Sequence, residues 1–262
     1  MIKEESALHR NILVIAHRGY SSKYPESTEL AYIRSVELGV DFIEADIQLS
    51  KDGHFVVFHD NDLSGVTDGK GRICDYNIHE LKQLNVLDKF DNKYGFQPIA
   101  TLAEVIEISK QSKVKICLEL KDISIRHIKN YEELIITFLT EYSSTQKVIF
   151  NLPDTPESDD FAKACRIKYP SIPIAYDFSI GEEKTNEIEA FIKRCLIHGI
   201  RIVEYEYSFM SKYIIRELKS NGIGVWVWTI NNEDDMINAI EMGADGILTD
   251  DPYKLCRLIG KI

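Results

Sequence analysis

The chain has 262 residues, 44% of them apolar, and a formal net charge of −11 at pH 7. This apolar fraction can fill a sizeable core and argues against disorder. The acidic balance disfavours nucleic acid and anionic membrane surfaces as partners. We expect no secretory signal in the polar residues 1–11 and no stable membrane insertion, since no apolar run approaches roughly 18 residues. Five scattered cysteines without a C-x-x-C pair favour a reduced, cytoplasmic protein.

Short apolar runs alternate with helical patterns along most of the chain. We expect strands over residues 12–16, 42–47, 114–120, 147–150, 172–175, 201–205, 225–229 and 246–249. We expect helices over residues 27–38, 130–142, 158–169, 184–197, 210–220, 232–242 and 252–259. This alternation predicts an α/β fold in which a parallel sheet closes into a (β/α)8 TIM barrel.

No polar or Pro/Gly-rich linker divides the chain, so residues 1–262 are expected to form a single domain. The exception to the alternation is the stretch from about residue 50 to residue 102. It begins with the hairpin turn signal Lys51-Asp52-Gly53 and contains a glycine-rich loop over residues 65–71. A long excursion after the second strand predicts a small inserted subdomain that acts as a lid or substrate wall.

Acidic side chains occur near the ends of two expected strands. Successive side chains of a strand point to alternate faces of the sheet. Glu44 and Asp46 therefore share one face of the strand over residues 42–47, and Glu119 and Lys121 share one face of the strand over residues 114–120 and its end. In a barrel these side chains would point inward near the C-terminal mouth, where active sites lie. Three converging carboxylates favour a divalent cation, and oxygen ligands favour Mg²⁺ or Ca²⁺. The alternative is simple ion pairing with Arg18 and Lys121.

Two histidines also stand at expected strand ends, His17 after the first strand and His59 after the hairpin. A two-residue turn would place Asp46 opposite His59, whereas a three-residue turn with a bulge at Gly53 would shift the pairing by one. In-line phosphoryl transfer needs a base, an acid and charge stabilisation. The histidines can supply the first two, and a metal with nearby basic residues can supply the third.

Other strand ends are less specific. Trp226 and Trp228 share a face of one strand, and either could wall a small pocket or pack in the core. Glu204 and Glu206 share a face of another strand, where we expect a solvated or ion-paired edge. The segment Asp250-Asp251-Pro252 is expected to begin the last helix, with Asp251 as its N-cap.

Several short motifs follow one another along nearly the whole chain. They are Ala16-His17-Arg18-Gly19, Pro25-Glu26-Ser27-Thr28, Glu44-Ala45-Asp46, Lys51-Asp52-Gly53, Phe58-His59-Asp60, Asp68-Gly69-Lys70-Gly71, Thr101-Leu102, Leu118-Glu119-Leu120-Lys121, Val227-Trp228-Thr229-Ile230-Asn231 and Gly243-Ala244-Asp245-Gly246-Ile247-Leu248-Thr249-Asp250-Asp251-Pro252. Each motif is weak alone. In this order they resemble the glycerophosphodiester phosphodiesterase family.

The resemblance implies a TIM barrel with an inserted subdomain after the second strand. It also implies metal-dependent hydrolysis of a small glycerophosphodiester to glycerol 3-phosphate and an alcohol, with one divalent cation, Mg²⁺ or Ca²⁺, as cofactor. The implied site residues are the metal ligands Glu44, Asp46 and Glu119, the acid–base pair His17 and His59, and the substrate-binding residues Arg18, Lys121 and Trp228.

The chain departs from the family pattern at four places. Ser27 replaces a usual Asn, Gly65-Val66-Thr67 replaces a common Arg-Thr-Thr, Ala100 replaces a usual Pro, and Phe150-Asn151 lacks a frequent Ser-Phe. None of these changes removes an implied metal ligand or histidine. The missing arginine at position 65 alters the polar network of the insertion, which bears on the rate and on the identity of the substrate rather than on the type of reaction.

Two other functions remain open. One is a non-catalytic sensor on the same barrel, which is disfavoured because the implied chemical positions are all retained. The other is a lyase similar to sphingomyelinase D, which would form a cyclic phosphate; that branch is marked by disulfides and secretion, which we do not expect here. The sequence leaves the released alcohol, the preferred metal and the oligomeric state open.

Overall fold

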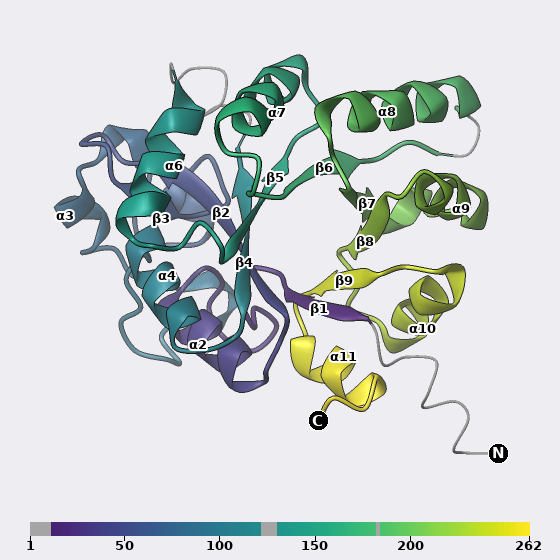
Figure 1. Ribbon diagram of the computed structural model, residues 1–262. Helices are drawn as coiled ribbons and strands as arrows, with labels where there is room; N and C mark the ends of the chain where they lie inside the picture. The colour runs from purple at the N-terminus through teal and green to yellow at the C-terminus, as the bar shows by residue number, and fades with distance from the viewer. Residues whose placement is uncertain (1–11, 122–129, 182–183) are drawn as a thin grey trace.

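The computed structural model describes residues 12–121, 130–181 and 184–262, in which eight parallel strands close into a barrel with helices around the outside (Figure 1). The strands are β1 (Leu13–Ala16), β2 (Phe42–Leu49), β4 (Lys115–Leu120), β5 (Val148–Leu152), β6 (Ile174–Phe178), β7 (Ile202–Glu206), β8 (Gly224–Trp228) and β9 (Gly246–Thr249). Strand β1 pairs with β9 on one side and with β2 on the other, which closes the sheet. Each strand overlaps one of the expected strands, so the predicted TIM barrel is confirmed.

The helices follow the strands along the chain. They are α2 (Glu29–Glu37), α4 (Leu102–Lys110), α6 (Tyr131–Glu141), α7 (Pro156–Lys168), α8 (Thr185–His198), α9 (Lys212–Ser220), α10 (Glu233–Met242) and α11 (Pro252–Leu258). All but α4 match an expected helix. Helix α4 begins with a capping box, in which Thr101 Oγ1 accepts from the Glu104 amide and Glu104 accepts from the Thr101 amide at 2.8 Å. None of the described helices is both long and apolar enough to cross a membrane.

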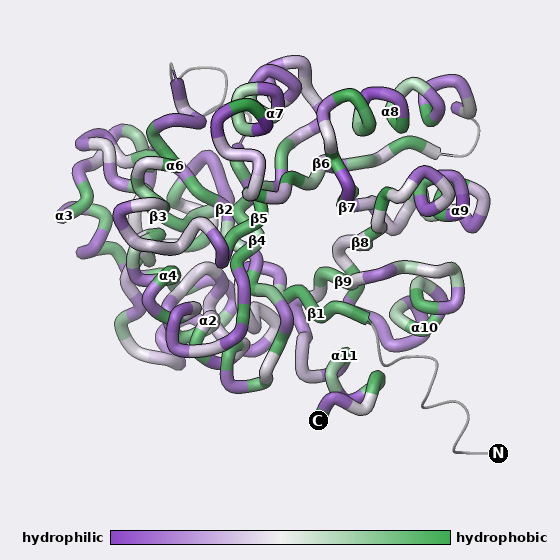
Figure 2. Tube along the Cα trace, in the orientation of Figure 1, coloured by the Kyte–Doolittle hydropathy of each residue, from purple (hydrophilic) through white to green (hydrophobic). Residues whose placement is uncertain are grey.

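Apolar side chains fill two regions, between the strands and the helices and inside the barrel. On the outer face, Ala45, Ile116 and Leu118 are fully buried against the helices. Figure 2 shows the corresponding pattern, with hydrophobic strands and helices that alternate between hydrophobic and hydrophilic residues. A smaller cluster that includes Cys117 and Trp226 fills the interior. The interior is therefore packed, which leaves the carboxyl ends of the strands to form the functional site.

The stretch between β2 and α4 folds over one side of the barrel (Figure 1). It contains β3 (Phe55–Val57), the short helix α3 (Ile78–Leu81) and the 3-10 turns η1 (Leu63–Gly65), η2 (Ile73–Asp75) and η3 (Asp88–Phe90). Its own apolar cluster is separate from the main core and is made of Val56, Phe58, Leu63, Ile73, Leu81, Val86 and Ile99.

The hairpin from β2 to β3 settles the register that the sequence left open. Ile47 pairs with Val57 and Leu49 with Phe55, and the Ser50 amide donates to the backbone oxygen of His54 at 2.9 Å. The turn therefore consists of the three residues 51–53. Gly53 has a φ of +82°, which glycine adopts at little cost. The two-residue alternative is therefore wrong, and the backbone oxygen of Asp46 accepts from the Phe58 amide at 2.9 Å rather than facing His59.

Candidate active site

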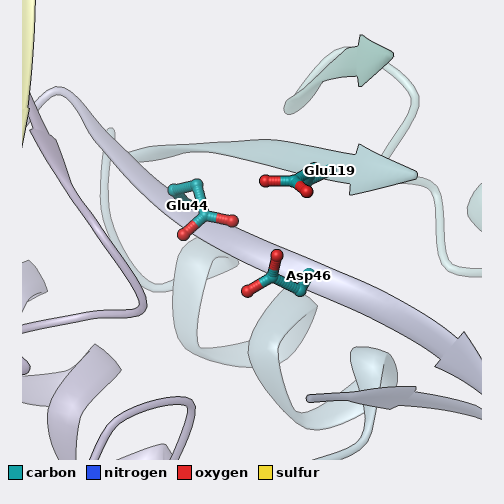
Figure 3. Close-up of side chains that lie close together, drawn as sticks. All are labelled: Glu44, Asp46 and Glu119. Carbon is teal, nitrogen blue, oxygen red and sulfur yellow. The ribbon is translucent and has the colours of Figure 1, made fainter. Parts of the chain in front are cut away.

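Three carboxylates meet inside the barrel mouth (Figure 3). Glu44 and Asp46 come from β2 and Glu119 from β4, and Asp46 and Glu119 are register partners in the sheet. One oxygen of each side chain lies within 4.8 Å of the others. The amide of Arg18 donates to Glu44 Oε2 at 2.9 Å. Lys121 Nζ lies 2.6 Å from Asp46 Oδ1 and 2.5 Å from Glu119 Oε1.

The pKa values of these carboxyls reflect an excess of negative charge. Burial and repulsion by Asp46 raise the pKa of Glu44 well above its usual range and that of Glu119 to about 7. Burial also favours the neutral form of Asp46, but nearby cations, Lys121 foremost, outweigh it and lower the pKa of Asp46. The carboxylates therefore carry more charge than the neighbouring side chains neutralise.

This donor set fits a hard divalent cation. All of its ligand atoms are carboxylate oxygens, which suit Mg²⁺ or Ca²⁺ rather than zinc. Among the residues that the structure describes, Glu44 Oε1 is buried without a hydrogen-bond partner. The alternative is ion pairing, in which Lys121 contacts Asp46 and Glu119 and Arg18 contacts Asp46. The raised pKa values of Glu44 and Glu119 indicate that these ion pairs leave part of the negative charge without a partner.

Arg18 is fixed at the end of β1 by two acidic residues. Its backbone has a φ of +54°. Its Nη1 donates to Glu26 Oε1 at 2.9 Å, and its Nε lies 3.6 Å from Asp46 Oδ2. Glu26 belongs to the motif Pro25-Glu26-Ser27-Thr28, and in the structure its carboxylate orients the guanidinium. A guanidinium fixed at the edge of a cavity has the donor geometry that can bind a phosphate oxygen.

Each of the two histidines has a carboxylate partner. His17 Nδ1 lies 2.7 Å from Asp250 Oδ1, and His59 Nδ1 lies 2.6 Å from Asp60 Oδ1. With Nδ1 engaged, Nε2 of each ring is the nitrogen left for a substrate. The His17 pair is the less exposed one, with side chains 19% and 27% exposed, against 35% and 41% for His59 and Asp60.

Asp250 is a site residue that the sequence analysis did not identify. It also accepts hydrogen bonds from Ser21 Oγ at 3.0 Å and from Asn231 Nδ2 at 2.6 Å. Burial favours its neutral form, but the hydrogen bond from His17 and the other donors outweigh burial and lower the pKa of Asp250 to about 2. The expected helix start is also present, since Asp251 caps α11 by accepting from the Lys254 amide at 3.1 Å. An aspartate at a strand end, next to that cap, was the signal in the sequence that could have identified Asp250.

A cavity of about 180 Å³ lies between these groups. Its lining residues are His17, Arg18, His59, Glu119, Asp177, Glu204, Trp228, Thr229 and Leu248. Of the two tryptophans, Trp228 reaches the cavity, while Trp226 packs inside the barrel against Phe42 with ring centroids 4.9 Å apart. The Trp228 Nε1 donates to the backbone oxygen of Glu204 at 2.9 Å, which fixes the indole ring.

The expectation that Glu204 lies on a solvated or ion-paired edge is wrong. Glu204 is 2% exposed rather than part of a solvated edge. The closed barrel brings β4 and β5 close enough for Cys117 Sγ and Asn151 Nδ2 to donate to it, each at 3.0 Å. Burial raises the pKa of Glu204 well above its usual range and that of its neighbour Asp177 to about 6. Asp177 also lines the cavity, and no pattern in the sequence singled it out.

The structure thus brings all eight residues implied by the sequence to one end of the barrel. A TIM barrel that gathers carboxylates, two histidines, an arginine and a lysine at the carboxyl ends of its strands has the architecture of an enzyme of this fold. The chain belongs to the Glycerophosphoryl diester phosphodiesterase family, whose profile matches residues 17–254.

Individual relatives agree over most of their length. The chain is 33% identical over 249 residues to a glycerophosphodiester phosphodiesterase of Caldanaerobacter subterraneus subsp. tengcongensis, a match that covers 95% of this chain and 98% of that protein. A solved phosphodiesterase of Oleispira antarctica, in complex with the product sn-glycerol-3-phosphate, has a TM-score of 0.81 and 27% identity, over 95% of this chain and 96% of that one. A solved glycerophosphodiester phosphodiesterase of Thermotoga maritima has a TM-score of 0.73 and 28% identity, over 95% and 99% of the two chains.

Proposed function

We propose that this protein hydrolyses glycerophosphodiesters to glycerol 3-phosphate and an alcohol, with one divalent cation and two histidines as the acid–base pair. The observation that carries the proposal is the convergence of an acidic cluster, two carboxylate-linked histidines and two basic side chains around one small cavity. Family membership supports the reaction class. The relative from Oleispira antarctica, whose structure holds sn-glycerol-3-phosphate, supports a small-molecule substrate.

The cation, Mg²⁺ or Ca²⁺, would be held by Glu44, Asp46 and Glu119. When bound, it supplies positive charge beside the phosphate. Arg18 and Lys121 add to this charge from the protein side. Together these groups explain how a chain with a net charge of −11 can hold an anionic diester.

His17 and His59 move the protons. Asp250 and Asp60 hold the Nδ1 side of the rings, so each Nε2 can accept or donate a proton at the cavity. One histidine takes the proton of the attacking hydroxyl or water, and the other gives a proton to the leaving alcohol oxygen. Each proton thus has a group that accepts or donates it, which is what hydrolysis of a diester with a poor leaving group requires.

We further propose that residues 1–262 act as a single domain in which the stretch from about residue 50 to residue 102 walls the site. That stretch supplies His59, which lines the cavity. The protein is proposed to be cytoplasmic, which is supported by its five free cysteines.

Phosphorus NMR of a glycerophosphodiester incubated with the protein and Mg²⁺ or Ca²⁺ tests the reaction. We expect the diester signal to be replaced by that of linear glycerol 3-phosphate, and addition of a chelator should stop the conversion. A cyclic phosphate would favour the lyase, and binding without conversion would favour the sensor. No conversion of any glycerophosphodiester by folded, cation-loaded protein would contradict the proposal.

A further inference from the structure

Two carboxyl groups of the cavity take no part in the chemistry described above. Asp177 on β6 and Glu204 on β7 are register partners in the sheet and both line the cavity. In the described part of the chain, neither forms an ion pair with a lysine or arginine within 4.0 Å. This distinguishes them from Asp46 and Glu119, which both contact Lys121.

The two carboxyls are not equivalent. Both oxygens of Glu204 are engaged, one by Cys117 and the other by Asn151. Only one oxygen of Asp177 is engaged, since Oδ1 accepts from Asn151 Nδ2 at 3.0 Å. Across the described residues no hydrogen bond reaches Asp177 Oδ2, and the buried Asn151 Oδ1 has no partner either. Asp177, which lines the cavity, therefore offers one acceptor oxygen that lacks a donor among the described residues.

The order of strands around the barrel places Asp177 across the cavity from Arg18, one of the two basic residues proposed to bind the phosphate. In the ring of eight strands, β6 lies opposite β1 and β7 lies opposite β2. Arg18 stands at the end of β1, and the carboxylates of the cation site stand on β2 and β4. Asp177 would repel a phosphate placed against it. The part of a ligand that faces Asp177 must therefore be a hydrogen-bond donor without negative charge.

The glycerol moiety of a glycerophosphodiester meets this requirement. Its free hydroxyl groups are donors and sit next to the phosphate, and its carbon chain can lie against Trp228 and Leu248 on the cavity lining. The cavity of about 180 Å³ is small, so it suits the part of the substrate that stays constant rather than the variable alcohol.

We propose that Asp177 selects the glycerol moiety by accepting a hydrogen bond from one of its free hydroxyl groups at Oδ2. Asn151 and Glu204 are positioning residues that hold Asp177 from behind through the hydrogen bonds of the Asn151 amide. The inference rests on the proposed function, since that function names glycerol as part of the substrate.

The test compares the binding of sn-glycerol 3-phosphate and of 1-propyl phosphate to the Mg²⁺-loaded protein by calorimetry. These ligands share the phosphate but only the first has free hydroxyl groups. The wild type should bind sn-glycerol 3-phosphate more tightly. Asp177→Asn should lower the affinity for sn-glycerol 3-phosphate by about 10- to 100-fold, because a hydrogen bond to a charged acceptor is lost. The affinity for 1-propyl phosphate, which has no hydroxyl group to donate, should change by under about twofold. In turnover, the loss should appear mainly in KM.

Two further variants complete the test. Glu206→Gln is the matched control, since Glu206 lies two residues after Glu204 on the same strand but does not line the cavity; it should bind both ligands like the wild type. Glu204→Gln should reduce the preference for glycerol partly. The inference would be overturned if Asp177→Asn lost affinity for both ligands equally, or if it kept the wild-type preference for sn-glycerol 3-phosphate. Neither result would bear on hydrolysis itself. A wild type that hydrolyses no glycerophosphodiester would instead overturn the proposed function.

Discussion

The two halves of the barrel mouth hold their acidic groups in different ways. In the half formed by β1, β2 and β4, carboxylates are interleaved with Arg18 and Lys121, and two of the carboxyls still have raised pKa values. In the half formed by β5 to β7, Asp177 and Glu204 are joined by a neutral amide and have no cationic partner within 4.0 Å among the described residues. This difference supports the two proposals, a phosphate and a cation in the first half and a neutral, hydrogen-bonding group in the second.

The largest effect is expected from removing a histidine of the first half. His17→Ala or His59→Ala should lower kcat by about 10³-fold, because a general acid or base is lost. Steady-state assays of glycerol 3-phosphate release would measure this. His79→Ala, which changes an exposed histidine outside the cavity, should behave like the wild type. Near-normal turnover in either catalytic variant would show that the assigned roles are wrong.

Glu119→Gln should weaken cation binding by about 10- to 100-fold or more, since it replaces a charged ligand by a neutral amide. Calorimetric titration with Mg²⁺ or Ca²⁺ would measure the change. Glu206→Gln again serves as a carboxyl-to-amide control outside the cluster. If the Glu119 variant binds the cation as tightly as the wild type, the cluster is only an ion-pair network.

Asp250→Asn should lower kcat by about 10- to 100-fold, with little change in KM, because the carboxylate that orients His17 is lost. The pH dependence of kcat should shift as well, which a purely structural effect would not produce. Asp251→Asn is a close control, because asparagine caps a helix as well as aspartate does. Equal losses in the two variants would point to damage at the start of α11 instead.

A smaller effect is expected from pH. The pKa of Glu119 is raised to about 7, and that of Glu44 is raised as well. The folded, cation-free protein therefore binds protons at these two carboxyls more tightly than the unfolded chain does. Stability without a cation should therefore fall as the pH rises from about 5 to above 7. Thermal unfolding in chelator at pH 6 and pH 8 would show this, and added cation should protect more at pH 8. A higher Tm at pH 8 in chelator would contradict the assignment.

The sequence predicted the parts of this molecule that depend on local pattern. Apolar runs identified the eight barrel strands, and alternation along β2 and β4 identified Glu44, Asp46 and Glu119 as one inward-facing group. The roles of these residues stay predictions. Helix α4 was missed, although the capping box at Thr101 was present in the sequence.

What the sequence did not predict depends on closure of the barrel. Asp250 meets His17 across 233 positions in the chain, a contact that exists only because β9 pairs with β1. Asp177 and Glu204 become cavity residues only when β5, β6 and β7 curve together. Glu204 resembled a solvated edge because strand alternation cannot show which inward position is buried.

The proposed reaction requires that a cation and two histidines act at one cavity. Its most direct test is the rate of glycerol 3-phosphate release by the wild type and by His17→Ala, each measured with Mg²⁺ or Ca²⁺, after chelation, and after the cation is restored. We expect wild-type activity that chelation abolishes and the cation restores, and a His17→Ala variant that binds the cation normally but stays inactive throughout. Full activity in chelator, or an active His17→Ala variant, would contradict the account.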